Sequence, residues 1–243
     1  TSKERLSYWT YFVGQNVYYN ITFIYLSAYL AMQGIALWKV SLVLLVVKVW
    51  DAINDPIFGY IFDKVKFKNG LKSLPWLRIA VALIPIVTIA VFTIPSGFSE
   101  TGKLIWFAVA YLLWDTVYTL TDVPAYSMLN TMTDNLGERN LLLSVNRVFS
   151  GAGYLLCVVV MPLLIGHSYA LAVIVLSIFS GLTMVPLCIF CKERNYHPEQ
   201  DEGDFSFKQM FTYLKSNKYL LTYYGGYMAT DALKTFNAVL LFV

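Results

Sequence analysis

The chain alternates long apolar runs with shorter polar connections, a pattern typical of helices that cross a lipid bilayer. A spanning helix needs about 20 mostly apolar residues, and six successive runs reach that length. A further run begins near Tyr219 and is still apolar at Val243, so we expect it to begin another bundle. The sequence therefore predicts an all-α membrane protein. The complete helices are predicted at residues 7–32, 38–62, 75–96, 103–131, 141–165 and 168–191.

One long polar connection divides this pattern in two. Residues 193–217 are rich in Glu, Asp and Gln, as in a surface loop. We expect an N-terminal six-helix transmembrane bundle at 1–192, a cytoplasmic linker at 193–217, and the first helix of an incomplete C-terminal bundle at 218–243. This order resembles the first half of a two-bundle secondary transporter, so a second six-helix half is expected. A short amphipathic helix in the linker is predicted from Phe205, Phe207, Met210, Phe211 and Leu214.

Composition and charge indicate that the bilayer is the solvent of this chain. Mean hydropathy is +0.58, and 58% of the residues are hydrophobic while only 14% are charged, unlike a soluble domain. The net charge of +3 is too small and too scattered to indicate binding to nucleic acid. Lys and Arg gather before the first helix and in the even-numbered connections. We therefore predict a multi-pass protein of the plasma or inner cell membrane with a cytoplasmic N-terminus.

The sequence contains no group of residues typical of an enzyme. It has no nucleophile beside a base, no cluster with metal-ligand spacing and no glycine-rich phosphate loop. Cys188 and Cys191 resemble a redox pair, but no second pair accompanies them and they end a helical pattern. We interpret them as residues of the membrane core. Neither an enzymatic activity nor a cofactor is predicted.

The second predicted helix carries charged residues at the depth of the bilayer. Asp51 and Asp55 are one turn apart and share a face with Asn54 and Lys48. Each unpaired charge at a helix centre costs about 2.5–3.5 kcal/mol, so this face needs a partner, a cavity or an ion. One alternative is an ion pair between Lys48 and one carboxylate, which leaves the other carboxylate over. Two carboxylates with an amide oxygen suit a small cation, and the carboxylates alone suit a proton equally well.

Several motifs occur together in an order that resembles a known family. Residues 50–56 read Trp-Asp-Ala-Ile-Asn-Asp-Pro, residues 59–64 read Gly-Tyr-Ile-Phe-Asp-Lys, and residues 118–124 read Tyr-Thr-Leu-Thr-Asp-Val-Pro, with Tyr126 close behind. Over residues 6–149 the chain resembles the glycoside-pentoside-hexuronide:cation symporters of the major facilitator superfamily, the melibiose-permease-like carriers. The resemblance implies the N-terminal six-helix bundle of a major facilitator fold, followed by the start of a seventh helix.

The resemblance also implies a coupling-cation site between the second and fourth helices. It assigns Asp51, Asn54 and Asp55 to this site, together with Thr119 of the fourth helix. Two carboxylates, an amide and a hydroxyl can replace much of the hydration shell of Na⁺, so we favour Na⁺ over H⁺. The alternative for Thr119 is a hydrogen bond to its own helix backbone, which is common for threonine in membrane helices.

A sugar site lined by the first, fourth and fifth helices is implied as well. Carboxylate and guanidinium groups bind paired sugar hydroxyls, and aromatic rings cover the apolar face of a sugar. This chain departs from the family, because amides at Gln15 and Asn16 replace a Lys and an Asp, and Tyr126 replaces a Trp. Asp122 and Arg147 have an alternative role as a mutual ion pair that locks the bundle. The predicted substrate-binding residues are Gln15, Asn16, Tyr118, Asp122, Tyr126 and Arg147.

Together these features predict a cation-coupled symporter of a sugar or glycoside that works by alternating access. Na⁺ is the favoured coupling cation, and H⁺ is the other candidate. The alternatives are a carrier of the same fold for a lysolipid or another amphiphilic solute, and a membrane sensor that does not transport. Three further intramembrane charges, at Asp115, Asp231 and Lys234, are not explained by the resemblance. Asp231 and Lys234 are one turn apart and are predicted to pair.

Overall fold

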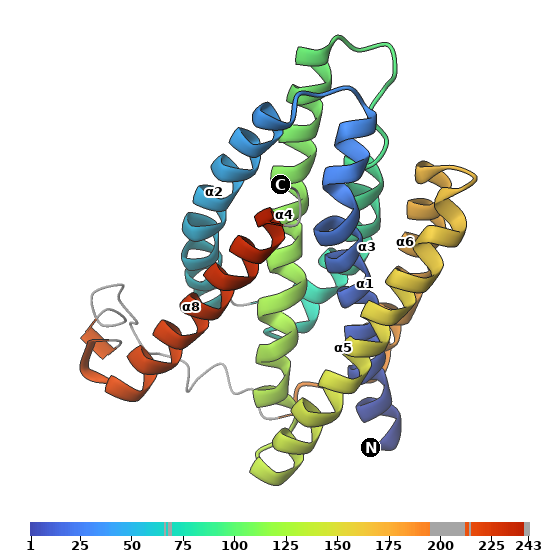
Figure 1. The fold of residues 1–243 in the computed structure, drawn as a ribbon. Helices are drawn as coiled ribbons and strands as arrows, with labels where there is room; N and C mark the ends of the chain where they lie inside the picture. Colours follow the sequence, from blue (N-terminus) through green and yellow to red (C-terminus); the bar gives the residue numbers. More distant parts are fainter. Residues whose placement is uncertain (66, 68–69, 195–211, 214, 241–243) are drawn as a thin grey trace. The chain divides into compact units, whose positions relative to one another are not determined.

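The protein consists of two compact units, Thr1–Tyr196 and His197–Val243. The first unit contains six long helices, and the described part of the second contains one (Figure 1). All seven described elements are thus helices, which confirms the predicted all-α class. The computed structural model describes residues 1–65, 67, 70–194, 212–213 and 215–240.

The helices of the first unit follow the apolar runs of the sequence. In the second unit, one helix begins at Lys218, close to the expected start. The predicted linker helix with Phe205, Phe207, Met210, Phe211 and Leu214 lies outside the described residues, and so do the side chains of Asp231 and Lys234. The helices are α1 (Ser2–Met32), α2 (Leu37–Lys64), α3 (Leu74–Val91), α4 (Glu100–Met132), α5 (Leu136–Ile165), α6 (Tyr169–Phe190) and α8 (Lys218–Leu240).

Local signals explain where the helix ends differ from the apolar runs. The Ser99 hydroxyl accepts a hydrogen bond from the Gly102 amide at 3.2 Å, so α4 begins before its apolar run. Asn135 caps α5 in the same way, because its Oδ1 accepts from the Glu138 amide at 3.1 Å. α3 ends earlier than predicted, since Pro95 disfavours helical backbone in the residue before it.

Four of the described helices, α3 to α6, are long and apolar enough to cross a membrane by length and composition. α1 and α2 have 31 and 28 residues, so their length also suffices. Their polar content separates them, because α1 carries Gln15, Asn16 and Asn20 while α2 carries Lys48 and Asp51. These two helices hold half of the predicted site residues, and most of the others lie on α4.

α1 connects the two sides of the first unit. It packs against α5 and α6, whereas α3 packs against α4 and α6, and α2 packs mainly against α4. Two glycines permit the close contacts of α1. A methyl group at Gly153 of α5 would lie 2.5 Å from the Val13 carbonyl oxygen, and one at Gly14 would collide with the Ser180 carbonyl oxygen of α6. Small residues at these crossings let the helix backbones touch, as in other membrane bundles.

Buried tyrosines fix the rotation of α1 about its axis. Tyr11 and Tyr18 are fully buried. The Tyr11 hydroxyl donates to the carbonyl oxygen of Thr121 in α4 at 2.8 Å, and that of Tyr18 donates to the carbonyl oxygen of Ser177 in α6 at 2.5 Å. These contacts hold the face of α1 that lies between them, which includes Gln15.

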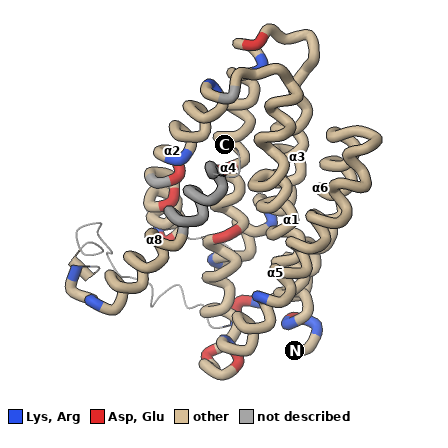
Figure 2. Tube along the Cα trace, viewed as in Figure 1, with Lys and Arg blue, Asp and Glu red and all other residues tan. Residues whose placement is uncertain are grey.

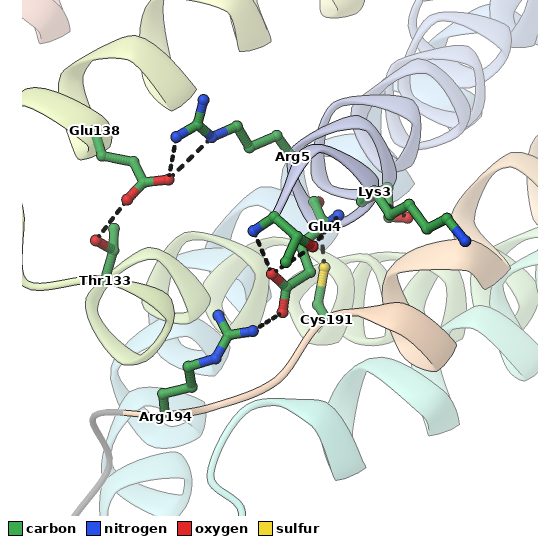
Figure 3. Close-up of polar contacts among 9 residues, drawn as sticks. Lys3, Glu4, Arg5, Thr133, Glu138, Cys191 and Arg194 are labelled. Atoms are coloured by element: carbon green, nitrogen blue, oxygen red, sulfur yellow. Dashed lines mark hydrogen bonds and ion pairs between the residues drawn. The ribbon is translucent and has the colours of Figure 1, made fainter.

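Polar side chains join the helices at the end of the bundle where the chain starts, and we call Glu4, Arg5, Thr133, Glu138 and Arg194 the end cluster (Figure 3). Arg194, just after α6, lies 2.5 Å from Glu4 of α1, and Arg5 lies 2.9 Å from Glu138 of α5. The Thr133 hydroxyl donates to Glu138 at 2.9 Å. Each charged side chain of the end cluster therefore has a partner of opposite charge.

The segment after α6 is attached to the bundle at a second point. The Glu193 carboxylate accepts hydrogen bonds from the amides of Lys72, Ser73 and Leu74 at 2.6, 2.7 and 2.6 Å. These amides begin α3, where backbone N–H groups lack helical partners and favour negative charge. The Arg194 amide adds a bond of 2.8 Å to the backbone of α4. The chain is therefore held to α1, α3 and α4 before it leaves the first unit.

Candidate functional site

The polar residues of α2 meet α4 about midway along both helices, where Figure 2 shows acidic positions on each helix. Lys48 Nζ lies 3.3 Å from Asp51 Oδ2, so one of the two ion pairs considered from the sequence is present. The side chains are 71% and 32% exposed, and such an accessible pair is weak. Asp55 forms no ion pair with another described residue. One carboxylate is therefore left over, as the sequence argument required.

Thr119 of α4 joins two of the predicted cation ligands. Asn54 Nδ2 donates to the Thr119 hydroxyl at 3.1 Å, and this hydroxyl donates to Asp55 Oδ1 at 3.1 Å. It also lies 3.2 Å from the Asp115 carbonyl oxygen, the contact with its own helix that was the alternative. Because a hydroxyl has one proton, these two acceptors compete for it. Asn54, Asp55 and Thr119 are thus in direct contact, while Asp51 lies one turn away.

The chemistry of this group suits a small hard cation. It combines carboxylate, amide and hydroxyl oxygens, the donors preferred by such ions. Asn54 and Thr119 are each 6% exposed, whereas Asp55 is exposed. In the described ranges, no three side chains of His, Cys, Asp or Glu converge closely enough to hold a metal ion. A cation held here would therefore depend on the amide and the hydroxyl as well as on the carboxylates.

The consecutive amides of α1 bind different neighbours. Gln15 is 2% exposed, and its Nε2 donates to Asp122 Oδ1 of α4 at 2.7 Å. Asn16 turns to α5, where its Nδ2 lies 3.0 Å from the Ser150 hydroxyl. The alternative ion pair between Asp122 and Arg147 is absent. Arg147 is exposed on α5 and forms no hydrogen bond or ion pair with another described residue.

Aromatic residues lie one helical turn before and after Asp122 on α4. Tyr118 stacks on Trp114 with ring centroids 5.1 Å apart and contacts Tyr19 of α1 at 5.9 Å. Tyr126 packs against Phe12 at 5.3 Å and is 45% exposed. Tyr118 is therefore held in place by its neighbours, while Tyr126 presents part of its ring at the surface of the unit.

α4 connects the two predicted sites. It contributes Thr119 to the contact with α2, and it contributes Tyr118 and Asp122 to the contact with α1. Asp122 also lies within electrostatic range of Asp55. Arg147 of α5 forms no hydrogen bond or ion pair with the described side chains assigned to the cation. The structure therefore joins most of the predicted residues through one helix and leaves Arg147 apart.

Several residues that support the site were given no role in the sequence analysis. Trp50 Nε1 donates to the Thr116 hydroxyl at 3.1 Å, which ties α2 to α4 beside the predicted ligands. Trp114 supports the Tyr118 ring, and Ser150 binds Asn16. The spacing of Trp114 and Tyr118 by one turn was an available signal. The partners of Trp50 and Asn16 lie far away in the sequence, and no local pattern indicates them.

A bundle of long apolar helices that carries charged and amide side chains midway along its helices is typical of a membrane transport protein. The chain matches the family described as MFS/sugar transport protein over residues 9–242, and it belongs to that family. It is a multi-pass membrane protein of a carrier family, not of an enzyme family, as the sequence predicted. Which side of the membrane its N-terminus faces stays a prediction.

Individual relatives give the same picture. The chain is 30% identical to "Uncharacterized symporter YjmB" of Bacillus subtilis (strain 168), with 90% of this chain and 50% of the relative covered. It is 27% identical to "Putative glycoside/cation symporter YagG" of Escherichia coli (strain K12), with 90% and 48% covered. "Sodium-dependent lysophosphatidylcholine symporter 1" of Xenopus tropicalis is 27% identical over 52% of this chain and 22% of the relative. The chain thus spans about half the length of the first two relatives.

Proposed function

We propose that this chain forms the N-terminal half of a cation-coupled symporter that moves a sugar or glycoside by alternating access. One observation carries the proposal. Thr119 contacts Asn54 and Asp55 across the interface of α2 and α4, and Asp122 lies one turn further along the same helix. A cation ligand and a solute ligand on one rigid element can bind their partners together. Na⁺ is the proposed cation, because the group offers neutral oxygens that a proton does not need.

The coupling follows from charge. A cation beside Asp55 lowers the negative potential around Asp122, so a neutral solute with hydroxyl groups can replace water there at lower cost. By linkage, a solute held at Asp122 strengthens cation binding by the same factor. When both are bound, the two halves of the full carrier exchange outward for inward access. In this proposal Gln15 orients Asp122, and Tyr118 and Tyr126 contact the solute.

A carrier of amphiphilic lipids is the second candidate. The similarity to a protein named as a sodium-dependent lysophosphatidylcholine symporter favours it. The half-exposed Tyr126 ring is also compatible with an apolar chain. The two candidates share the cation site and differ in the solute.

Uptake by the full-length protein in proteoliposomes tests the proposal. We expect a panel of labelled glycosides, pentoses, hexuronides and lysophosphatidylcholine to contain a sugar that accumulates with an inward Na⁺ gradient. Asp55→Asn should lower this accumulation about 100-fold, because loss of a charged ligand contact costs about 2.7 kcal/mol. Glu100→Gln is the matched control, since Glu100 is a carboxylate that pairs with Lys39 at 2.9 Å at the start of α4. Accumulation of the lysolipid alone would select the second candidate, and binding without accumulation would indicate a sensor.

A further inference from the structure

Asp115 is a buried acidic residue that the proposed function does not use. It is 9% exposed, and its Oδ2 atom is buried without a hydrogen-bond partner in the described part of the chain. Burying an ionised carboxylate without a partner costs several kcal/mol. Such a group is expected to gain a partner in at least one state of the carrier.

The contacts of α2 with α4 place Asp115 near the cation site. Trp50 binds Thr116 and Asn54 binds Thr119, so residue numbers rise together along the two helices. Asp115 precedes Thr119 by one helical turn and shares its face of α4.

On α2, Asp51 precedes Asp55 by one turn in the same way, so Asp51 and Asp115 lie at the same level. The charges of Asp51, Lys48 and Asp55 all act on Asp115. The carboxylates of Asp51 and Asp115 repel each other, while the Lys48 ammonium attracts both. Asp115 therefore interacts with the charges of Lys48, Asp51 and Asp55. Among the described side chains, it does not come close enough to the two other acids to form a metal site with them.

Lys48 is suited to exchange partners. Its ion pair with Asp51 is 3.3 Å long, and its side chain is 71% exposed and thus not packed in one position. The other basic residues of α2 and α4, which are Lys39, Lys64 and Lys103, lie near the helix ends. Lys48 is therefore the ammonium of these two helices that lies at the level of Asp115.

We propose that Lys48 transfers from Asp51 to Asp115 when the coupling cation binds. In the empty carrier the ammonium occupies Asp51 and acts as a tethered competitor of the cation. A cation that enters between Asp51 and Asp55 displaces it, and the unpartnered Oδ2 of Asp115 accepts it. Asp115 is then a positioning residue, which stabilises the cation-bound state without touching the cation. This inference rests on the proposed function, because it requires a cation between α2 and α4.

Equilibrium binding of radioactive Na⁺ to the purified full-length protein tests the exchange. Asp115→Asn should weaken Na⁺ binding about tenfold, because Lys48 then has no second partner and stays on Asp51. Lys48→Met should bind Na⁺ at least as tightly as the wild type, since the competitor is gone. The decisive variant combines both changes, and its Na⁺ affinity should lie within about twofold of Lys48→Met alone.

The double variant separates the inference from its rivals. If Asp115→Asn weakens binding by the same factor with and without Lys48, Asp115 is a direct ligand or a packing residue, and the exchange is overturned. An unchanged affinity in Asp115→Asn overturns it as well. The wild type could bind Na⁺, lose this binding in Asp55→Asn and keep the same Na⁺ affinity in both Lys48→Met and Asp115→Asn. That result would contradict this inference but not the proposed function. A wild type that binds no Na⁺ contradicts the Na⁺ site of the proposed function too. Glu100→Gln and thermal unfolding of each variant control for misfolding.

Discussion

Two groups of charged residues in the first unit follow opposite rules. In the end cluster, each acid is matched by a base, as Glu4 is by Arg194 and Glu138 is by Arg5. Midway along α2 and α4, Lys48 forms an ion pair with Asp51, while Asp55 and Asp115 form no ion pair with a described residue. Charges that satisfy one another hold helices together. Charges left over inside a bilayer need a partner that the helices themselves do not supply, and this is the property of a site for a mobile cation.

The largest effect on stability is expected from the most buried side chain of the end cluster. Glu4→Gln keeps the shape of the side chain, which is 5% exposed, but removes the charge that neutralises Arg194. We expect the free energy of unfolding to fall by about 2 kcal/mol, because a charge-assisted contact is lost at a buried site.

The measurement for Glu4→Gln is thermal or denaturant unfolding of the purified full-length protein, with Na⁺ binding measured alongside. Na⁺ affinity should stay within about twofold of the wild type. If Glu4→Gln were as stable as the wild type but bound Na⁺ more weakly, the end cluster would serve cation binding and not helix packing, contrary to this comparison.

An intermediate effect is expected at the contact of α2 with α4, where the Na⁺ affinity and not the free energy of unfolding should change. Thr119→Val replaces a hydroxyl with a methyl group of similar size and removes the contacts with Asn54 and Asp55. Na⁺ binding should weaken about tenfold, because one ligand oxygen is lost and Asn54 is no longer oriented.

Thr133→Val is the matched control for Thr119→Val, because the Thr133 hydroxyl contacts Glu138 in the end cluster. Equilibrium binding of radioactive Na⁺ compares the two. Equal affinities would show that the Thr119 hydroxyl has only a backbone role.

The smallest effect is expected from the accessible ion pair of the end cluster. Arg5 and Glu138 are 42% and 28% exposed, so solvent screens their attraction. Arg5→Gln should lower the free energy of unfolding by about 0.5 kcal/mol, which denaturant unfolding can resolve against Glu4→Gln. If Arg5→Gln lowered the free energy of unfolding as much as Glu4→Gln, the stability contributed by these ion pairs would not depend on their burial.

The sequence predicts the helices well, because the period of apolar residues needs no knowledge of the fold. Its errors occur at helix ends, where Ser99 and Asn135 act through single hydrogen bonds. The packing order of the helices depends on contacts such as Gly153 with Val13, which are distant in the sequence. No local pattern gives that order.

The same distinction applies to the candidate site. Asp51, Asn54 and Asp55 form one recognisable motif, and Thr119 and Asp122 form part of another. The partners chosen by these residues could not be predicted. Arg147 was the partner considered for Asp122 from the sequence, but the amide of Gln15 binds Asp122 instead, on an α1 whose rotation is fixed by its buried tyrosines. Charge alone would have favoured the arginine.

The attachment of Glu193 and Arg194 to the bundle affects where the proposed two-half carrier could be divided into two polypeptides. A first polypeptide that ends beyond Arg194 retains the carboxylate at the start of α3 and the partner of Glu4. A polypeptide that stops at Phe190 loses both, although it contains every residue of the six helices. Co-expressed halves divided after Arg194 should therefore assemble more efficiently than halves divided at the last helical residue.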